Sequence, residues 1–215
     1  MDKRRERQKL IIEKARETYI EKGLFNTVMD NIADKANITR RTLYRYFETK
    51  EELAYEVTIE ILKDWNNYQL GLFETLEGRG IDRLHEFLIN SIGHLRKMNN
   101  TMKYLGEFDS YFHDNNLPQS NNRSANKLSK VIHVSDDLLK KIIILGQADN
   151  SIISDIDIDL TVSTISNILW SFCQRIAIRN NTMQKETSFS GMDLIRNQVK
   201  LYIMALEKRR SNERS

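Results

Sequence analysis

The sequence has 215 residues, of which 40% are hydrophobic and 29% are charged, with 8 glycines and one proline, a mixture typical of soluble chains built mostly from helices. No stretch approaches the roughly 18 apolar residues that a membrane span needs. The charged start MDKRRERQKL has no apolar core behind it, so we expect no secretory signal, no membrane partner and a cytoplasmic location. The single cysteine, Cys173, excludes an internal disulfide.

Positive charge gathers at the start of the chain. Residues 1–50 contain 13 Lys and Arg against 8 Asp and Glu, a net charge of +5, whereas the remaining 165 residues sum to −2. Lys and Arg contacts to phosphates supply most of the sequence-independent affinity of nucleic-acid-binding proteins. The distribution therefore predicts a nucleic-acid-binding head, although a solvated helix face would carry similar charges.

Three short helices are predicted at the N-terminus. Apolar residues with helical spacing indicate a helix over 10–22 that ends at Gly23. A second helix is expected to begin at Thr27, whose hydroxyl can cap it, and to last about ten residues. Asn37 suits the turn that follows because Asn tolerates positive φ. Thr39 is the expected cap of a third helix.

Longer helices are predicted next. Thr49 and Glu52 have the spacing of a capping box and open a fourth helix, and Asp82 is the expected cap of a fifth. A sixth is expected over 102–112. The polar run 115–126, which contains Pro118, predicts a loop.

A seventh helix is expected to end near Gly146. Residues 156–160 alternate apolar and acidic side chains, which taken alone is a strand signal. We expect instead a loop whose aspartates cap an eighth helix, because a lone strand would lack a partner. The eighth and ninth helices, over about 162–176 and 192–206, have near-coiled-coil spacing. The sequence thus predicts an all-α fold of about nine helices, with a head of short helices in residues 1–50 and a helical body in residues 51–215.

Residues 29–48 meet the demands of a helix-turn-helix, in which the last helix exposes base-reading side chains while its inner face packs on the others. Arg can bind guanine with two hydrogen bonds, Thr can contact a base or a phosphate, and Tyr can place its hydroxyl on a phosphate. The expected outward residues are Thr39, Arg40, Arg41, Thr42, Tyr44 and Arg45.

The run from Gly23 to Leu53, GLFNTVMDNIADKANITRRTLYRYFETKEEL, closely resembles the N-terminal signature of the tetracycline-repressor (TetR) family. The matching positions are Thr27, Ile32-Ala33, Ile38-Thr39, Leu43 to Phe47, and Lys50 to Leu53. The resemblance implies that Thr27, Tyr44 and Lys50 hold phosphates and that Thr39 to Thr42 face bases. Asn37 replaces the usual turn glycine, and Arg41 stands where many members have a small residue.

The resemblance also implies a ligand-responsive repressor that binds a double-stranded, palindromic operator as a homodimer. Residues 1–50 would be its helix-turn-helix DNA-binding domain, and residues 51–215 its helical effector-binding and dimerisation domain. The expected dimer interface comprises Ile165, Leu169, Phe172, Ile195, Val199, Tyr202 and Leu206. An apolar or amphipathic effector is expected between helices four to eight, in a pocket lined by Trp65, Leu88, Met98, Met102, Leu105, Phe108, Phe112, Leu139, Ile143 and Trp170. The alternative for these residues is that they simply fill the core.

Nothing in the sequence predicts an enzyme, a cofactor or a metal site. The four histidines, His85, His94, His113 and His133, lack metal-ligand spacing, and neither a glycine-rich phosphate loop nor a nucleophile motif is present. The competing function is a DNA-binding protein that senses no small molecule and is controlled by a partner protein, or that acts architecturally on the chromosome.

Overall fold

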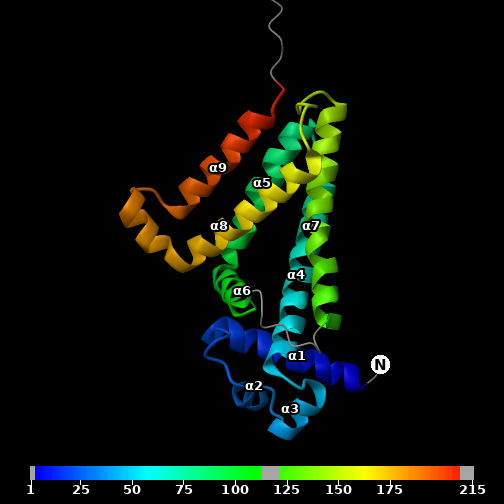
Figure 1. Cartoon of the computed structure of the whole chain (residues 1–215), viewed down its shortest axis with the longest axis vertical. Helices are drawn as coiled ribbons and strands as arrows, with labels where there is room; N and C mark the ends of the chain where they lie inside the picture. Colours follow the sequence, from blue (N-terminus) through cyan, green and yellow to red (C-terminus); the bar gives the residue numbers. More distant parts are fainter. Residues whose placement is uncertain (1–2, 113–121, 209–215) are drawn as a thin grey trace, which may run out of the picture. The chain divides into compact units, whose positions relative to one another are not determined.

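The computed structural model describes residues 3–112 and 122–208, and over these residues the chain forms nine helices (Figure 1). They are α1 (Lys3–Lys22), α2 (Met29–Lys35), α3 (Arg40–Tyr46), α4 (Lys50–Thr75), α5 (Gly80–Lys97), α6 (Asn99–Tyr111), α7 (Asn122–Ala148), α8 (Ile158–Thr187) and α9 (Gly191–Leu206). The predicted all-α fold class is therefore confirmed. Within the described ranges, no helix is both long and apolar enough to cross a membrane.

The chain divides into two compact units. The first contains Met1–Trp65 and Met98–Ile132, and the second contains Asn66–Lys97 and His133–Ser215. Helices α4 and α7 each contribute residues to both units.

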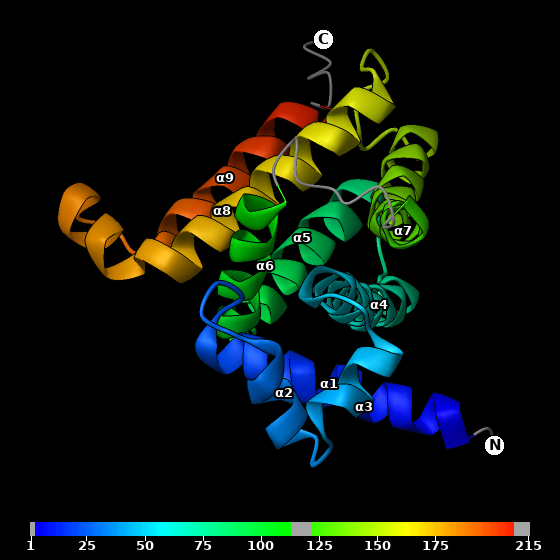
Figure 2. The same ribbon diagram turned by 60° about the horizontal axis from the view of Figure 1, so that its bottom comes forward.

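In the first unit, α1 packs against α2 and α6, and α2 packs against α3 (Figure 2). The Tyr19 ring of α1 stacks on the Tyr104 ring of α6, with centroids 5.6 Å apart. The Tyr104 hydroxyl donates to the Ala54 carbonyl of α4 over 3.1 Å and lies 2.9 Å from the Thr58 hydroxyl. Burial raises the pKa of both tyrosines well above the usual value. A neutral, hydrogen-bonded junction therefore joins α1, α4 and α6.

Two predicted helix boundaries in this unit are confirmed. Gly23 follows α1 with a φ of +81°, which only glycine adopts without strain. The Thr49 hydroxyl accepts the backbone N–H of Glu52 over 3.0 Å and so caps α4. The Glu52 carboxylate reaches back to the N–H of Glu48 rather than to that of Thr49.

In the second unit, α5 packs against α8 and α9, which also pack against each other. The predicted cap of α5 is wrong, because Asp82 lies inside the first turn and pairs with Arg79. The first N–H groups of α5 are instead accepted by Asp149, 2.7 Å from the nitrogen of Gly80, and by Ser151, 3.0 Å from the nitrogen of Ile81. The helix is thus capped by a segment about 70 residues away.

The predicted loop before α8 is confirmed, since the Asp157 carboxylate accepts the N–H of Leu160 over 2.9 Å and caps the helix. Of the loop predicted over 115–126, residues 115–121, with Pro118, lie outside the described residues. Residues 122–126 belong to α7, so for them the loop prediction is wrong. Helix α7 therefore begins at Asn122, earlier than the sequence predicts.

Candidate nucleic-acid interface

The connection between α2 and α3 is a tight turn. Asn37 adopts a φ of +50°, as predicted. Its N–H donates to the Asp34 carbonyl, and the N–H of Ile38 donates to the Ala33 carbonyl, each over 3.0 Å. These bonds fix the direction in which α3 leaves α2. The local geometry is that of a helix-turn-helix.

Helix α3 begins at a threonine cap, also as predicted. The Thr39 hydroxyl accepts the N–H of Thr42 over 3.2 Å and lies 3.0 Å from the Thr42 hydroxyl. Thr39 therefore serves the helix terminus with the same oxygen that was expected to face a base.

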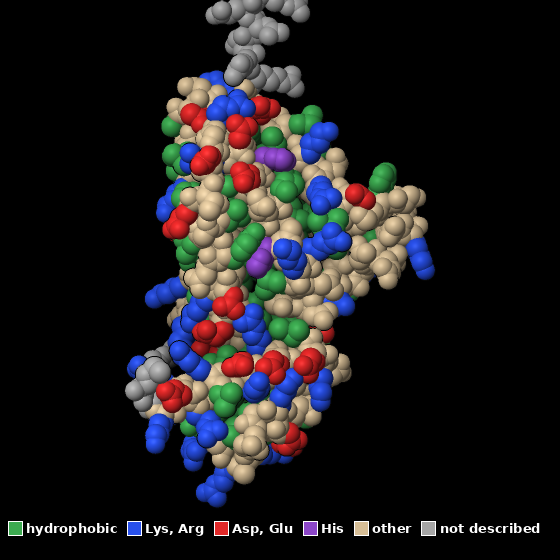
Figure 3. All heavy atoms as spheres, turned by 180° about the vertical axis from the view of Figure 1, so that it is seen from behind, with side chains coloured by type: hydrophobic (Ala, Val, Ile, Leu, Met, Phe, Trp, Pro, Cys, Tyr) green, Lys and Arg blue, Asp and Glu red, His purple; other side chains and the backbone are tan. Residues whose placement is uncertain are grey.

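The two faces of α3 differ sharply in composition. Leu43 is fully buried and Phe47, directly after the helix, is 1% exposed, so these two side chains anchor the inner face. The opposite face carries polar side chains, all exposed except the half-buried Thr42: Thr39, Arg40, Arg41, Thr42, Tyr44 and Arg45. Figure 3 shows Lys and Arg side chains gathered with some acidic ones over the surface of the α1–α3 head.

The two adjacent arginines of α3 are in different environments. Arg40 pairs with Asp30 of α2 over 3.2 Å, and its guanidinium carbon lies 5.4 Å from the centroid of the Tyr44 ring. Arg41 is exposed and has no ion pair or ring contact within the described part of the chain. Arg40 is thus held beside α2, whereas Arg41 extends freely from the surface.

Thr27 differs from its predicted role. The residue is fully buried, and its hydroxyl donates to the Gly23 carbonyl over 2.7 Å. The N-cap of α2 is Val28, one residue later, so the predicted cap is wrong. The Thr27 hydroxyl thus bonds within the connection from α1 to α2.

Lys50, also predicted to hold a phosphate, is half-buried. Its ammonium lies 5.3 Å from the centroid of the Tyr111 ring, a cation–π geometry. Burial lowers its pKa, and Glu51 and Glu107 partly oppose this effect. Tyr111 donates to the Glu51 carboxylate over 2.6 Å, and this hydrogen bond is the main reason why its pKa rises to about 12.

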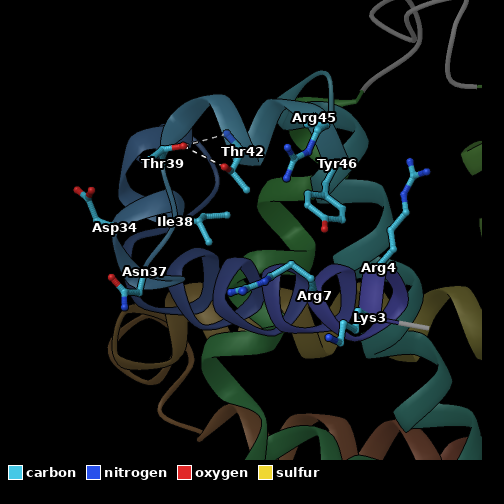
Figure 4. Close-up of a pocket in the computed structure, with 10 residues that line it drawn as sticks. All are labelled: Lys3, Arg4, Arg7, Asp34, Asn37, Ile38, Thr39, Thr42, Arg45 and Tyr46. Carbon is cyan, nitrogen blue, oxygen red and sulfur yellow. Dashed lines mark hydrogen bonds between the residues drawn. The ribbon is translucent and has the colours of Figure 1, made fainter. Parts of the chain in front are cut away.

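A concavity of about 1120 Å³ opens beside α3. Figure 4 shows its lining, with α1 contributing one side and the turn and α3 contributing the other. The lining residues are Lys3, Arg4, Arg7, Asp34, Asn37, Ile38, Thr39, Thr42, Arg45 and Tyr46. The three α1 cations contribute to the positive charge of residues 1–50, but the sequence pattern does not assign them to a site.

The residues predicted for an effector pocket fall in both compact units. Trp65, Met98, Met102, Leu105, Phe108 and Phe112 belong to the first unit, and Leu88, Leu139, Ile143 and Trp170 belong to the second. Met98, Phe112 and Trp170 are half-buried, and the others are buried. Each unit thus holds part of the predicted lining within its own core.

Most of the predicted dimer-interface residues are buried within the chain. Ile165, Leu169, Ile195, Val199 and Leu206 are at most 7% exposed, while Phe172 and Tyr202 are half-buried. Within a single chain these two apolar stripes therefore face inward rather than toward solvent. The apolar side chains that α8 and α9 do expose are Leu160, Ile168, Ile178, Leu201 and Met204.

A buried polar pair in the second unit was not predicted. Gln69, 4% exposed, donates to the Ser91 hydroxyl over 3.4 Å. The Oε1 atom of Gln69 has no hydrogen-bond partner among the described residues. No sequence signal distinguishes this glutamine from a solvent-facing one.

The structure also bears on metals and histidines. Among the described residues, no three His, Cys, Asp or Glu side chains are grouped so that they could hold a metal ion. His94 stacks on Tyr68 with centroids 3.7 Å apart, and its pKa is lowered mainly by burial. Of the other three histidines, His113 lies outside the described residues.

Residues 11–57, which contain this turn and α3, match the model of the bacterial regulatory proteins of the tetR family. The match covers the N-terminal head of the chain, which is similar to the DNA-binding head of this family. The TetR resemblance drawn from the motif is confirmed. IcaR of Staphylococcus aureus, the HTH-type negative transcriptional regulator of the biofilm operon icaADBC, is 32% identical over 82 residues, which are 38% of this chain and 44% of IcaR. The chain matches less than half the length of its curated relatives.

Solved structures resemble the chain over most of its length. The transcriptional regulator FadR of Bacillus subtilis, in complex with stearoyl-CoA, has a TM-score of 0.64 at 16% identity and covers 92% of this chain and 98% of its own. A transcriptional regulator from Saccharomonospora viridis, in complex with choline, has a TM-score of 0.68 at 18% identity, with 95% and 99% covered. These likenesses show the fold, a helix-turn-helix head followed by a helical body.

Proposed function

We propose that this chain is a transcriptional repressor that binds a palindromic operator as a homodimer and is released by a small amphipathic effector. One observation carries the proposal: α3 anchors an apolar inner face in the head and exposes an outer face made of polar and cationic side chains. In this proposal residues 1–50 form the DNA-binding domain, and residues 51–215 form the effector-binding and dimerisation domain.

The exposed arginines of α3 are the proposed base readers. A guanidinium can donate two hydrogen bonds to guanine O6 and N7 in the major groove. Arg41 suits this role because its side chain is exposed and has no internal partner among the described residues. Arg40 would first have to loosen its pair with Asp30. Tyr44, Arg45 and Lys50 are proposed phosphate contacts.

The proposed test is selection of bound duplexes from a random pool, followed by affinity measurements on the selected sequence. The matched variants each remove three positive charges: R40A/R41A/R45A from α3, and K97A/K141A/K185A from exposed positions of the second unit. We expect only the α3 variant to lose binding. Equal losses would mean that affinity follows overall charge, and an unaffected α3 variant would refute α3 as the reading helix.

A dimer provides the second half-site that one short helix needs for useful specificity. The exposed apolar residues of α8 and α9 support a subunit interface there, because large exposed apolar surfaces usually mark interaction sites.

Two observations support an amphipathic effector. The similar regulators of Bacillus subtilis and Saccharomonospora viridis were solved with stearoyl-CoA and with choline, so this fold accommodates organic ligands. Within the second unit, the unpaired Gln69 Oε1 is a buried acceptor, and leaving such a group unsatisfied costs about 1–3 kcal/mol. A ligand donor could supply the missing hydrogen bond.

Gln69→Leu tests this proposal against partner control. We expect the ligand-free variant to be about as stable as the wild type, since the substitution removes the unsatisfied Oε1 acceptor but also the 3.4 Å hydrogen bond from Gln69 to Ser91. Stearoyl-CoA and choline serve as first probes in thermal-shift and DNA-release assays. A probe that binds should weaken operator binding, and operator should weaken probe binding by the same factor. Failure of every probe to change operator affinity would favour the partner-controlled alternative.

A further inference from the structure

The concavity beside α3 has a markedly cationic lining. Lys3, Arg4 and Arg7 of α1 face it together with Arg45 of α3, against the single carboxylate of Asp34 (Figure 4). Concave surfaces lined by one sign of charge concentrate counter-ions. The electrostatics of this surface therefore favour an anionic occupant.

Three of these four cations have no ion-pair partner among the described residues. Lys3, Arg7 and Arg45 form none within the described ranges of the chain, although the Arg45 guanidinium lies 5.7 Å from the centroid of the Tyr46 ring. Elsewhere in the head, by contrast, Lys35 pairs with Glu17 and Glu21. Within the described residues, acids of the head thus pair with Lys35 but not with Lys3, Arg7 or Arg45.

The positive charges at the start of α1 oppose the macrodipole of that helix. The first turns of α1 carry Lys3, Arg4, Arg5 and Arg7, with Glu6 as the single acid. The macrodipole disfavours positive charge at a helix start. Helices α2, α4, α5, α8 and α9 follow the usual rule and place acids in their first turn without a basic cluster. Fold stability alone does not account for the cluster on α1.

The size of the concavity selects the occupant. A volume of about 1120 Å³ exceeds the roughly 300–1,000 Å³ typical of small-molecule sites, and a single phosphate would fill little of it. One of its walls is α3, the helix proposed to enter the major groove. A sugar–phosphate strand bordering that groove is adjacent to α3 by necessity, because the groove is only about 12 Å wide.

We propose that this concavity holds the DNA backbone beside the reading helix, with Lys3, Arg7 and Arg45 as phosphate ligands. The inference rests on the proposed function and extends the interface from α3 to the start of α1. Asp34, the one acid in the lining, keeps the strand on the cationic side by repulsion. The contacts carry no base information, so they act on every duplex alike.

The test compares K3Q/R7Q with R5Q/K9Q, which removes two exposed charges from the same helix outside the lining. Affinity for the selected operator and for a random duplex is measured by fluorescence anisotropy between 50 and 300 mM KCl. The slope of log affinity against log salt concentration changes by roughly 0.9 for each phosphate contact, which this range resolves. We expect K3Q/R7Q to make this slope shallower on both duplexes, by an amount that corresponds to nearly two phosphate contacts per chain. R5Q/K9Q should leave it near the wild-type value. The melting temperature of K3Q/R7Q should not fall, because the removed charges oppose the helix dipole.

Each outcome is decisive. Equal slopes for the two double variants would overturn the inference while leaving the repressor proposal intact. Absence of duplex binding by the wild type would overturn both. Calorimetry with inorganic phosphate tests for a free anion: phosphate binding that K3Q/R7Q abolishes, with an unchanged DNA slope, would assign the concavity to a small anion and refute the DNA contact.

Discussion

The α1–α3 head and the α8–α9 pair differ in how well a sequence pattern predicts which side chains lie on the surface. In the head, the outward residues predicted from the sequence are on the surface, as with Arg41 and Arg45. In the α8–α9 pair, the residues predicted to face a second subunit are inside the chain, as with Ile195 and Val199. A charged side chain can rarely be buried, whereas an apolar stripe can be covered by its own chain or by another.

The largest expected effect is a loss of stability on substitution in the buried apolar stripe of α9. Val199 is fully buried, so Val199→Asp would place an unpaired carboxylate in the core of the second unit. We expect unfolding or a loss of about 3–5 kcal/mol, the range found for uncompensated buried charges. Chemical denaturation followed by circular dichroism measures it. A well-folded monomer would instead mean that Val199 faces a second subunit.

The next effect concerns the exposed residues of the same helix. Met204 is 60% exposed, on the opposite side of α9 from Val199. We expect Met204→Asp to keep the circular-dichroism spectrum and to convert dimers into monomers in sedimentation experiments at micromolar concentration. Asn90→Asp, which adds one negative charge at an exposed position of α5, is the control. A wild-type monomer would remove the basis of the proposed dimer.

The boundaries and caps show which parts of the fold the sequence could supply. Asn37, Thr39, Thr49 and Asp157 were predicted correctly because a cap or a turn acts over three or four residues. The cap of α5 was not, because Asp149 and Ser151 reach it from another part of the chain. Thr27 was misassigned because its hydroxyl bonds back to Gly23 rather than forward.

The same distinction between local and tertiary contacts applies to the candidate site. The exposed α3 residues follow from one helix and its motif. The cations of α1 join them only through the tertiary packing of the head, so a local pattern could register their charge but not their position in the concavity. The unpaired oxygen of Gln69 is likewise a property of packing.

The arginine pair sharpens the comparison within the head. Arg41→Ala should cost roughly 1–3 kcal/mol of operator affinity and relax the preference at one base pair, as expected for a bidentate guanine contact. Arg40→Ala should cost less and weaken all duplexes similarly, because Asp30 holds Arg40 beside α2. Both variants are measured on single-base operator changes at fixed salt. The assignment is reversed if Arg40→Ala alone relaxes the base preference.

The smallest expected effect separates positioning from reading at Thr39. Its hydroxyl caps α3 and its methyl group is available to a thymine, so the two roles reside on different atoms. Thr39→Ala removes the cap and should cost about 0.5–2 kcal/mol of stability, whereas Thr39→Ser keeps the hydroxyl and should preserve most of it.

If Thr39 only positions the helix, the serine variant will bind the operator with wild-type preference. If the methyl group reads thymine, the serine variant will keep its stability yet lose discrimination at a single T·A pair. We expect the first result, because the hydroxyl lies in the internal bond to Thr42 and the side chain also lines the proposed phosphate concavity. Denaturation curves and single-base operator panels, measured on both variants, distinguish the two roles.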